Sequence, residues 1–369
     1  MPGPAPEPAP FGVYVHVPFC AARCDYCAFA TWTDRDGLMA DYTDACLSEL
    51  ARAGDDEGLD PATSVFVGGG TPSRLPAEHL ARVVDAIDRH PEAEVTAECN
   101  PEDATAARFA RWRAAGVNRV SFGVQSMVPH VLAALGRRHG TTDVRRAVAL
   151  AGDAGFRSTN VDLILGAAAE TDDDLLATLD AVLSLEPRPA HVSAYLLTVE
   201  PGTPLARDPA RHPDDDASAR RYEIVDTTLS GAGYRWYEVS NWAVPGHECR
   251  HNRLYWAQGD YRGVGCAAHS HRSGRRWWNV RTPERYIGAV RAGRSPVAGE
   301  EVLSESQRIF EGLALALRTS GGVPASVVPD DPDLDPLLDR RGERAVLSVR
   351  GRLLANEVSV RLGVPGNLP

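Results

Sequence analysis

Short apolar runs alternate with helical patterns along residues 13–243, and this alternation constrains the fold more than any other feature of the chain. Amphipathic stretches lie between the runs and after the last one, and several of them end in Ala-Gly, a common helix stop. Repeated strand–helix units predict a parallel sheet covered by helices. Because six units are two fewer than in a full barrel, we expect an α/β fold with an open, partial (β/α)6 barrel. The predicted strands are residues 13–17, 64–69, 94–98, 119–125, 160–165 and 191–197.

Polar or glycine residues lie in or directly after five of the predicted strands. Because ligands in parallel α/β folds gather at the carboxyl ends of the strands, these residues predict a single site there. They are Cys20 after the first strand, Gly69, Gly70 and Thr71 around the end of the second, Glu98 at the end of the third, Gln125 at the end of the fourth, and Asp162 within the fifth.

Three of the seven cysteines, Cys20, Cys24 and Cys27, follow the first predicted strand with the spacing C-x3-C-x2-C. Clustered thiolates hold zinc or iron–sulfur clusters. Zinc needs a fourth ligand, and the nearest candidate, His16, lies within the predicted strand, an awkward place from which to reach the same ion. A four-iron cluster held by three cysteines instead leaves one iron open to a substrate or cofactor.

The composition is that of an ordinary soluble globular enzyme, with 43% hydrophobic and 24% charged residues. A formal net charge of −11 argues against nucleic acid or an anionic membrane as the main partner. All 39 basic residues are arginine, which excludes a Schiff-base lysine and a P-loop lysine. The start of the chain lacks the features of a signal peptide, and no run of about 18 apolar residues is present. We therefore expect a cytoplasmic protein with reduced cysteines.

The cysteine triplet, followed by the turn Gly-Gly-Gly-Thr-Pro after the second predicted strand, resembles the pattern of radical S-adenosylmethionine (radical SAM) enzymes. The resemblance extends from Tyr14 to the C-terminal stretch GRLLANEV. It implies a 4Fe-4S cluster on Cys20, Cys24 and Cys27, whose open iron chelates the amino and carboxylate groups of S-adenosylmethionine. One electron from the cluster then cleaves the sulfonium to methionine and a 5′-deoxyadenosyl radical, while the protein positions and shields the cofactor.

The same resemblance implies which residues contact S-adenosylmethionine. A structural role stays open for some of them: a plain turn for the glycines, a strand-end cap for Glu98 and a surface position for Arg137. The implied residues are Tyr14, Tyr26, Gly69, Gly70, Thr71, Glu98, Gln125, Arg137 and Asp162.

Within this superfamily the chain resembles the oxygen-independent coproporphyrinogen III oxidase group, and in that group the HemW-type heme chaperones. The oxidase pattern has a further cysteine two residues after the third, where this chain has Phe29. The oxidases also carry a substantial segment before the first strand, whereas this chain has about ten residues of Pro/Ala-rich tail. Both differences favour the HemW type.

The stretch HNRLYW, residues 251–256, matches the H-N-x-x-Y-W pattern that is linked in this group to heme binding. Imidazole is a common axial ligand of heme iron, so the match implies His251 as a heme ligand, with Tyr255 and Trp256 stacked against the macrocycle. A hydrogen-bonded core histidine is the alternative. Cys249 is a weaker candidate ligand.

We expect the other cysteines and clustered histidines to be structural. Cys46 lies in a predicted helix and Cys99 follows a predicted strand, and both are expected to be small buried hydrophobes. Cys266, His269 and His271 look metal-like, but the family has a Gly-rich loop there. The chain departs from the family pattern in LGAAAETDDD, which replaces a Gly-x-Pro-Gly turn after the fifth strand, and in GVGCAAHS, where Cys-Ala replaces Pro-Gly. Both departures affect the shape of the adenosyl-side and heme-side loops.

These patterns divide the chain into four parts. Residues 1–10 are expected to form a flexible tail, and 11–239 the radical SAM core. Residues 240–283, rich in Trp, Tyr, His and Gly, are expected to form an irregular, heme-proximal insertion. Residues 284–369 are expected to form a small, mostly helical, HemN-like C-terminal domain.

The resemblance implies a heme chaperone that binds heme and passes it to apo-hemoproteins, with a 4Fe-4S cluster, S-adenosylmethionine and an electron donor. We expect no nucleic-acid partner and no transmembrane segment; peripheral membrane association, and a monomer or a homodimer, stay open. The first alternative is an oxygen-independent coproporphyrinogen III oxidase, which decarboxylates propionate side chains to give protoporphyrinogen IX. Radical-based heme degradation is a third function and rests on fold-level analogy.

Overall fold

The computed structural model describes residues 10–57 and 59–363, with side chains for 10–54 and 59–363. Six strands pair in parallel in the order of the chain, from β1 to β6, so the predicted parallel sheet is confirmed. The strands are β1 (Phe11–Val17), β2 (Ala62–Gly69), β3 (Arg89–Cys99), β4 (Arg119–Gln125), β5 (Ser158–Leu165) and β6 (His191–Leu196).

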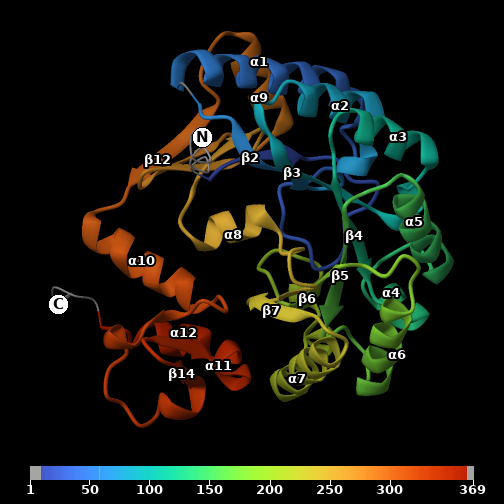
Figure 1. Cartoon of the computed structure of the whole chain (residues 1–369). Helices are drawn as coiled ribbons and strands as arrows, with labels where there is room; N and C mark the ends of the chain where they lie inside the picture. The colour runs from blue at the N-terminus through green and yellow to red at the C-terminus, as the bar shows by residue number, and fades with distance from the viewer. Residues whose placement is uncertain (1–9, 58, 364–369) are drawn as a thin grey trace, which may run out of the picture.

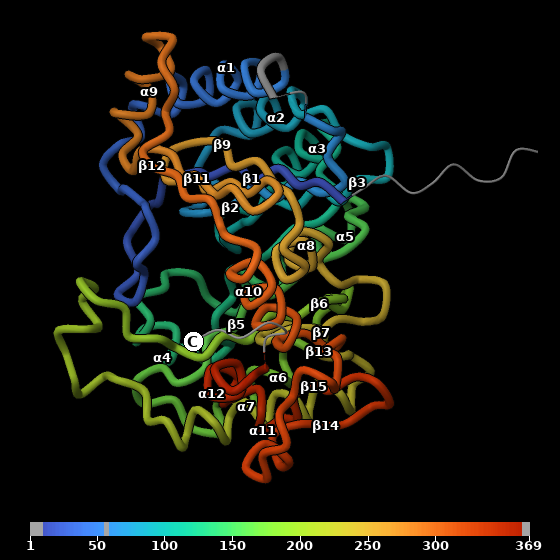
Figure 2. The backbone as a smooth tube through the Cα atoms, turned by 90° about the vertical axis from the view of Figure 1, so that its left-hand side faces the viewer, coloured from blue at the N-terminus to red at the C-terminus, as the bar shows by residue number. Residues whose placement is uncertain are grey.

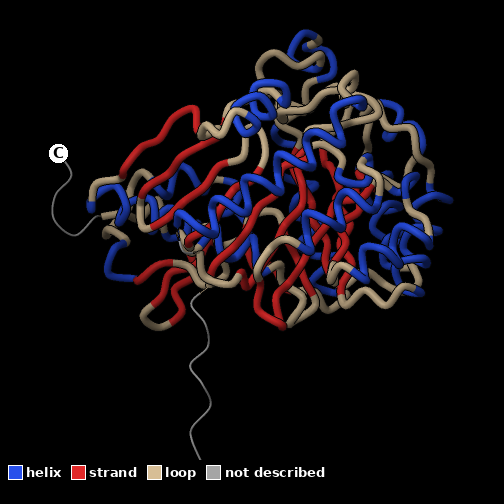
Figure 3. Tube along the Cα trace, turned by 90° about the horizontal axis from the view of Figure 1, so that it is seen from above, coloured by secondary structure: helices blue, strands red, loops and turns tan. Residues whose placement is uncertain are grey.

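Helices cover the outer face of these strands and form an arc around them (Figures 1 and 3). Apolar stripes on the helices drive this packing. Leu80, Val83 and Val84 of α2 (Ala77–Asp85) are buried in the same core as the alternate valines of β1. Among the described residues, no helix is long and apolar enough to cross a membrane. The helices of the arc are α1 (Met39–Glu57), α2 (Ala77–Asp85), α3 (Ala106–Ala114), α4 (Pro129–Ala134), α5 (Thr141–Asp153), α6 (Asp172–Leu183) and α7 (Asp215–Gly231).

Each of the six parallel strands carries a partly exposed position within an otherwise buried stretch. Because helices cover the outer face, we place these positions on the inner face, where solvent reaches the interior of the partial barrel. Tyr195 is the clearest example of such a position, since it is 43% exposed although it lies in the core strand β6. The positions are Tyr14, Phe66, Glu98, Gly123, Asp162 and Tyr195.

Residues 240–283 are largely regular, so the expectation of an irregular insertion is wrong. Here β9 pairs in parallel with β1, and β10 and β11 continue the sheet in antiparallel order. The glycines allow close packing: a Cβ at Gly263 would lie 2.0 Å from the carbonyl oxygen of His269. The elements are β8 (Asn241–Ala243), α8 (Arg250–Trp256), β9 (Asp260–Val264), β10 (His269–Arg272) and β11 (Arg275–Asn279), and β7 (Arg235–Glu238) directly precedes them.

Helix α8 lies inside the arc and closes the amino end of the parallel strands (Figure 1). A Cβ added to Gly12, near the start of β1, would meet side chains of α8 at 2.5–3.1 Å. The backbone N–H of Arg250 donates to Glu94 Oε1 at 2.8 Å. The loop after β1 projects from the other end of the strands (Figure 2).

The remaining chain extends the sheet and then leaves it. Helix α9 (Pro283–Arg291) packs on α1, and β12 (Val297–Val302) pairs with β11, so the full order is β12-β11-β10-β9-β1-β2-β3-β4-β5-β6-β8-β7. Helix α10 (Glu305–Leu317) then runs from the β12 edge towards the β7 edge (Figure 1). There the N–H of Val239 donates to Arg318 O at 3.2 Å, and the N–H of Ser320 donates to Tyr237 O at 2.9 Å.

The C-terminal residues form a small unit with a separate apolar core that begins at Leu317. The predicted division of the chain into four parts stays a prediction, and the position of this second core favours a later start of the C-terminal unit than residue 284. The unit contains β13 (Val323–Pro324), β14 (Leu338–Arg341), β15 (Arg344–Leu347), α11 (Val349–Leu353) and α12 (Ala355–Ser359).

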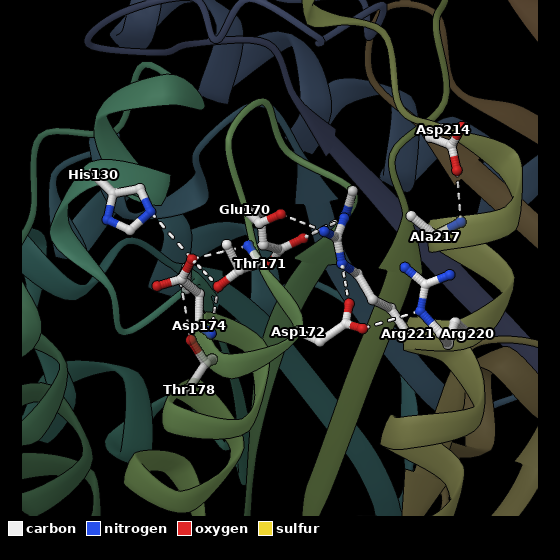
Figure 4. A network of polar contacts seen from close by, with 12 residues as sticks. His130, Glu170, Thr171, Asp172, Asp174, Thr178, Asp214, Ala217, Arg220 and Arg221 are labelled. Carbon is white, nitrogen blue, oxygen red and sulfur yellow. Dashed lines mark hydrogen bonds and ion pairs between the residues drawn. The ribbon is translucent and has the colours of Figure 1, made fainter.

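The turn after β5, where Pro and Gly are missing, is held by buried charge (Figure 4). Arg221 is 8% exposed and lies 3.4 Å from Glu170 Oε2 and 3.2 Å from Asp172 Oδ1. Glu170 Oε2 also accepts the N–H of Gly166 at 2.6 Å. Ala169, in the same turn, has a left-handed φ of 61°. Ion pairing therefore holds a backbone shape that the family pattern assigns to Pro and Gly.

We predict that Arg221→Ala lowers the unfolding free energy by about 3 kcal/mol or more, because it leaves the carboxylate of Glu170 buried and unpaired. The neighbouring Arg220→Ala is the matched control, since Arg220 is exposed and also pairs with Asp172. We expect this control to change stability little. Urea unfolding followed by circular dichroism measures both, and equal losses in the two variants would contradict the prediction.

Candidate cluster and cofactor site

The loop after β1 brings the three cysteines to one place. Its two ends are tied together, because the N–H of Cys20 donates to Trp32 O at 3.0 Å and the N–H of Trp32 donates to Pro18 O at 2.8 Å. Burial raises the pKa of Cys20, and the nearby thiols of Cys27 and Cys24 add to the rise. Cys20 is buried, whereas Cys24 and Cys27 are half-buried. The three thiols are therefore close enough at this end of the barrel to interact electrostatically.

Residues around the thiols fit an iron–sulfur cluster better than a single ion. Within the described ranges, no three His, Cys, Asp or Glu side chains are grouped so as to hold one metal ion. The ring of His16, the candidate fourth zinc ligand, instead lies 3.2 Å from the Tyr14 hydroxyl and 2.9 Å from Ala30 O. In a four-iron cluster each thiolate binds a different iron, so the sulfurs need not converge on one point.

Hydrogen-bond donors also surround the sulfurs, as a thiolate-held cluster requires. The hydroxyl of Thr71 donates to Cys20 Sγ at 3.5 Å, and Nη1 of Arg137 donates to Cys24 Sγ at 3.6 Å. A Cβ at Gly70 would lie only 3.0 Å from Cys20 Sγ, so the glycine leaves room beside the sulfur.

The turn after β2 lies directly against the cysteine loop. The N–H groups of Gly70 and Thr71 donate to Val17 O at 2.8 Å and Phe19 O at 2.9 Å. The N–H of Gly69, whose φ is 110°, donates to Glu98 Oε2 at 3.2 Å. These N–H groups therefore already have partners, so a ligand at the turn would have to use its carbonyl oxygens, which suit an ammonium group.

Arg137 is half-buried and hydrogen-bonded near the strand ends, which favours a place in the site over the surface alternative. Its Nη2 donates to Gly123 O at 2.7 Å and to Asn100 Oδ1 at 2.9 Å. Gln125 lies beside it and has a left-handed φ of 66°, a strained conformation that is common at functional sites. Tyr26 interacts electrostatically with Arg137. Asn100 was not expected here from the sequence, although it follows β3 at the same edge of the sheet.

Two carboxyl groups lie in the interior, close enough for the charge of Asp162 to act on Glu98. Burial raises the pKa of Glu98 to about 8, and the charge of Asp162 adds to this. Burial also raises the pKa of Asp162, while hydroxyl and amide donors lower it. Among them, Ser121 and Asn160 donate to Asp162 at 3.0 and 2.8 Å. Glu98 is therefore protonated at neutral pH, and Asp162 is the better candidate for a negative charge.

The structure places His251 away from the cysteines, at the closed amino end of the barrel. Its Nδ1 lies 2.9 Å from Ser64 Oγ and its Nε2 lies 2.8 Å from Tyr255 Oη. The residue is 1% exposed, and burial lowers its pKa to about 3. In this conformation His251 is a hydrogen-bonded core histidine, the alternative reading, and heme ligation by it stays a prediction.

A row of rings connects His251 to the interior. The rings of His251 and Phe66 stack with centroids 5.7 Å apart, and those of Phe66 and Tyr14 with centroids 6.5 Å apart. Phe66 was not singled out from the sequence, because it lies within an apolar run. The nine residues implied for S-adenosylmethionine are linked by contacts around the cysteines and Glu98, and their roles stay predictions.

The remaining cysteines are buried, as expected for small hydrophobes. Cys46, Cys99 and Cys266 are 3% exposed or less, and the Tyr42 hydroxyl donates to Cys266 Sγ at 3.6 Å. Cys249 is also buried, and burial raises its pKa to about 12, so it offers no accessible thiolate to heme.

We predict that Glu98→Gln stabilises the protein at pH 8 but not at pH 4. A folded-state pKa of about 8, above the unfolded value of 4.5, makes the wild type lose stability as the pH rises between these values. Glutamine removes the charge and still accepts from Gly69. The difference in unfolding free energy, from urea titrations, should grow by about 1.4 kcal/mol per pH unit. A difference independent of pH would contradict this.

For His251 the pH dependence of the unfolding free energy has the opposite sign to that for Glu98. Its folded-state pKa of about 3 lies below the unfolded value of 6.5, so its stabilising effect is full above pH 6.5 and is lost on acidification. We predict that His251→Asn reduces the slope of unfolding free energy against pH, between pH 6 and 4, by about 1.4 kcal/mol per unit. An unchanged slope would show that the imidazole is not buried and neutral.

Comparison with known proteins agrees with this geometry. Residues 14–182 match the radical SAM superfamily. The chain is 44% identical to the heme chaperone HemW of Mycobacterium tuberculosis H37Rv over 97% of this chain and 96% of that protein. It is 39% identical to the HemW of Escherichia coli K12 over 70% of each chain, and 32% identical to that of Bacillus subtilis 168 over 94% of this chain and 97% of the relative.

The fold also has a solved counterpart. It resembles coproporphyrinogen III oxidase (HemN) from Escherichia coli, described as a radical SAM enzyme, with a TM-score of 0.82 at 22% identity over 95% of this chain and 89% of that one. This likeness identifies the fold and leaves the activity open. On the strength of the sequence identity over nearly its whole length, the chain belongs to the HemW-type family of radical SAM proteins.

Proposed function

We propose that this protein is a heme chaperone that binds heme and transfers it to apo-hemoproteins, and that it carries a 4Fe-4S cluster and S-adenosylmethionine. The observation that carries the proposal is the 44% identity, over nearly the full length of both chains, to a relative named heme chaperone HemW. Phe29 supports it, because an exposed phenyl ring stands where the oxidases have a further thiol.

Cys20, Cys24 and Cys27 would hold the cluster. When bound, the cluster and S-adenosylmethionine supply one-electron chemistry, driven by an external electron donor. The protein's own residues bind and orient these groups. The carbonyl oxygens of the turn at Gly69 and Gly70 would accept from the methionyl ammonium, and Arg137 would neutralise charge beside Cys24.

Carboxyl groups lie deeper in the barrel and suit the adenosyl part. With its pKa raised to about 8, Glu98 can donate a hydrogen bond as well as accept one at neutral pH. Asp162 would accept from ligand hydroxyl groups, held in place by Asn160 and Ser121. Tyr14 and Tyr26 would flank the cofactor from the barrel wall and from the cysteine loop, and Gln125 would meet its ribose or methionyl groups.

Heme ligation by His251 would require this residue to release Ser64 or Tyr255, because both ring nitrogens now have partners. Tyr255 and Trp256 are half-buried and offer ring surface to a flat apolar ligand. We therefore propose that heme binding at HNRLYW is coupled to movement of α8. We also propose that the protein acts in the cytoplasm and that its clients are apo-hemoproteins of the respiratory chain.

An oxygen-independent coproporphyrinogen III oxidase is the second candidate. The observation that favours it is the fold shared with HemN over 95% of this chain. Phe29 counts against it.

Anaerobic reconstitution with iron and sulfide tests both functions in parallel. We predict that the wild type gains iron–sulfur absorption, binds heme and passes it to an apo-hemoprotein, and does not decarboxylate coproporphyrinogen III with S-adenosylmethionine. Cys24→Ser should lose the cluster absorption, whereas the buried Cys46→Ser, outside the loop, should keep it.

Turnover of coproporphyrinogen III would favour the oxidase and overturn the chaperone proposal. Heme affinity unchanged in His251→Ala would refute His251 as the ligand while leaving heme transfer intact. Cluster absorption that is unchanged by Cys24→Ser would refute the cysteine assignment.

A further inference from the structure

His191 is a buried histidine that the site as described does not use. It lies in β6 and is 1% exposed. Its Nδ1 lies 2.6 Å from Asn160 Oδ1, and its Nε2 lies 2.8 Å from Tyr237 Oη. Both ring nitrogens therefore have a polar partner, and one of these partners, Asn160, donates to the carboxyl group of Asp162.

The pairing of β5 with β6 explains why these side chains meet. In the parallel register Asn160 lies beside His191, and Asp162 lies beside Ser193. Because side chains alternate between the two faces of a strand, all four lie on the inner face of the sheet. Asp162 is half-buried and can reach a ligand, whereas the other three are buried and can act on a ligand only through it.

The partners of the His191 ring fix where its proton lies. Burial and the nearby charge of Arg119 lower the pKa of His191 well below its usual value, so the ring is neutral. The amide oxygen of Asn160 can only accept a hydrogen bond, so Nδ1 carries the proton and is the donor. Nε2 then accepts from the hydroxyl of Tyr237, whose oxygen in turn accepts from the N–H of Cys249 at 3.4 Å.

A donating Nδ1–H also decides which way the Asn160 amide faces. With the amide oxygen held by His191, Nδ2 donates to Asp162 Oδ1 at 2.8 Å and to Ser121 Oγ at 2.7 Å. The reverse orientation would put the amide oxygen against the carboxylate, where two acceptors repel each other. The hydroxyl of Ser193 also donates to the amide oxygen, at the longer distance of 3.3 Å. His191 is therefore the closer of the two donors that select the amide orientation.

We propose that His191 is a positioning residue of the cofactor site, which holds the Asn160 amide so that its NH2 group supports Asp162 as a hydrogen-bond acceptor. Asp162 thereby stays oriented towards hydroxyl groups of the adenosyl part. The inference rests on the proposed function, because it takes Asp162 as a contact of S-adenosylmethionine, and it adds a residue that was not singled out from the sequence.

Titration of S-adenosylmethionine into the reconstituted protein, without heme or clients, tests this proposal through the dissociation constant. His191→Leu removes the donor, whereas His191→Asn keeps an amide N–H near the position of Nδ1. Both variants remove the partner of the Tyr237 hydroxyl, so the difference between them isolates the contact with Asn160. We expect about tenfold weaker binding in the leucine variant, which is about 1.4 kcal/mol and within the range for one hydrogen bond. The asparagine variant should bind as tightly as the wild type.

Equal affinities of His191→Leu and the wild type, with equal iron content, would overturn the proposal. A loss of affinity in His191→Asn as large as that in His191→Leu would also overturn it, because the loss of Nε2 would then explain both.

The tautomer of His191 gives a second measurement, which needs neither cluster nor cofactor. In protein with isotope-labelled histidine, the nitrogen chemical shifts of His191, assigned by their absence in His191→Asn, should show a neutral ring with its proton on Nδ1. Tyr237→Phe removes only the donor to Nε2 and should shift the Nε2 signal. Tyr222→Phe is the matched control, because this buried tyrosine lies in α7 and its hydroxyl donates to Val239 O at 2.7 Å. We expect it to leave the His191 signals unchanged.

A proton on Nε2, or an Nε2 signal that Tyr237→Phe leaves unchanged, would overturn the proposal. This measurement decides alone if His191→Leu fails to fold or to retain iron. A wild type that assembles no cluster or binds no S-adenosylmethionine would instead refute the proposed function. The two failures are thus distinguishable.

Discussion

The candidate site depends on one close approach of two backbone segments, the chain after β1 and the turn after β2. Hydrogen bonds of 2.8 and 2.9 Å join Gly70 and Thr71 to Val17 and Phe19. A Cβ at Gly70 would lie 2.8 Å from Val17 O and 3.0 Å from Cys20 Sγ, so any side chain would push the turn away. This contact brings the hydroxyl of Thr71 to Cys20.

Burial of charge in the interior governs the second layer of the site. Burial raises the pKa of both Glu98 and Asp162, and the charge of Asp162 raises that of Glu98 further. Glu98 keeps its proton near neutral pH, while Asp162 is supported by hydroxyl and amide donors from the neighbouring strands. An unequal pair of this kind gives a cofactor one donor and one acceptor within the same hollow.

The motif HNRLYW, which lies in α8, has a structural role besides any role in heme binding. His251 bonds to Ser64 and Tyr255, and Asn252 donates to Glu238 Oε1 at 3.5 Å. Burial raises the pKa of Glu238 to about 7, and Trp256 is among its donors. The motif thus ties α8 to the amino end of the barrel, so a ligand that recruits His251 competes with contacts that hold this helix in place.

The sequence by itself determined the family, the parallel sheet and the cysteine loop. Hydrophobic periodicity places the six strands, and polar residues at their ends must meet at one edge, so Cys20, Glu98 and Asp162 could be assigned to one site. The Gly-rich turn was recognisable because it follows the second predicted strand in a chain that also carries the cysteine triplet. The aromatic segment 240–283, by contrast, has no clear periodic pattern and looks irregular in the sequence, although its glycines allow tight strand packing.

Only the tertiary structure decided which side chains have partners. Whether His251 is a free ligand or a core residue depends on Ser64, which lies 187 residues away in the chain. Asn100 gains its place in the site only from its contact with Arg137. Hydrogen bonding and burial depend on contacts between segments that are distant in the chain. They therefore cannot be predicted from residue type and spacing along the chain alone.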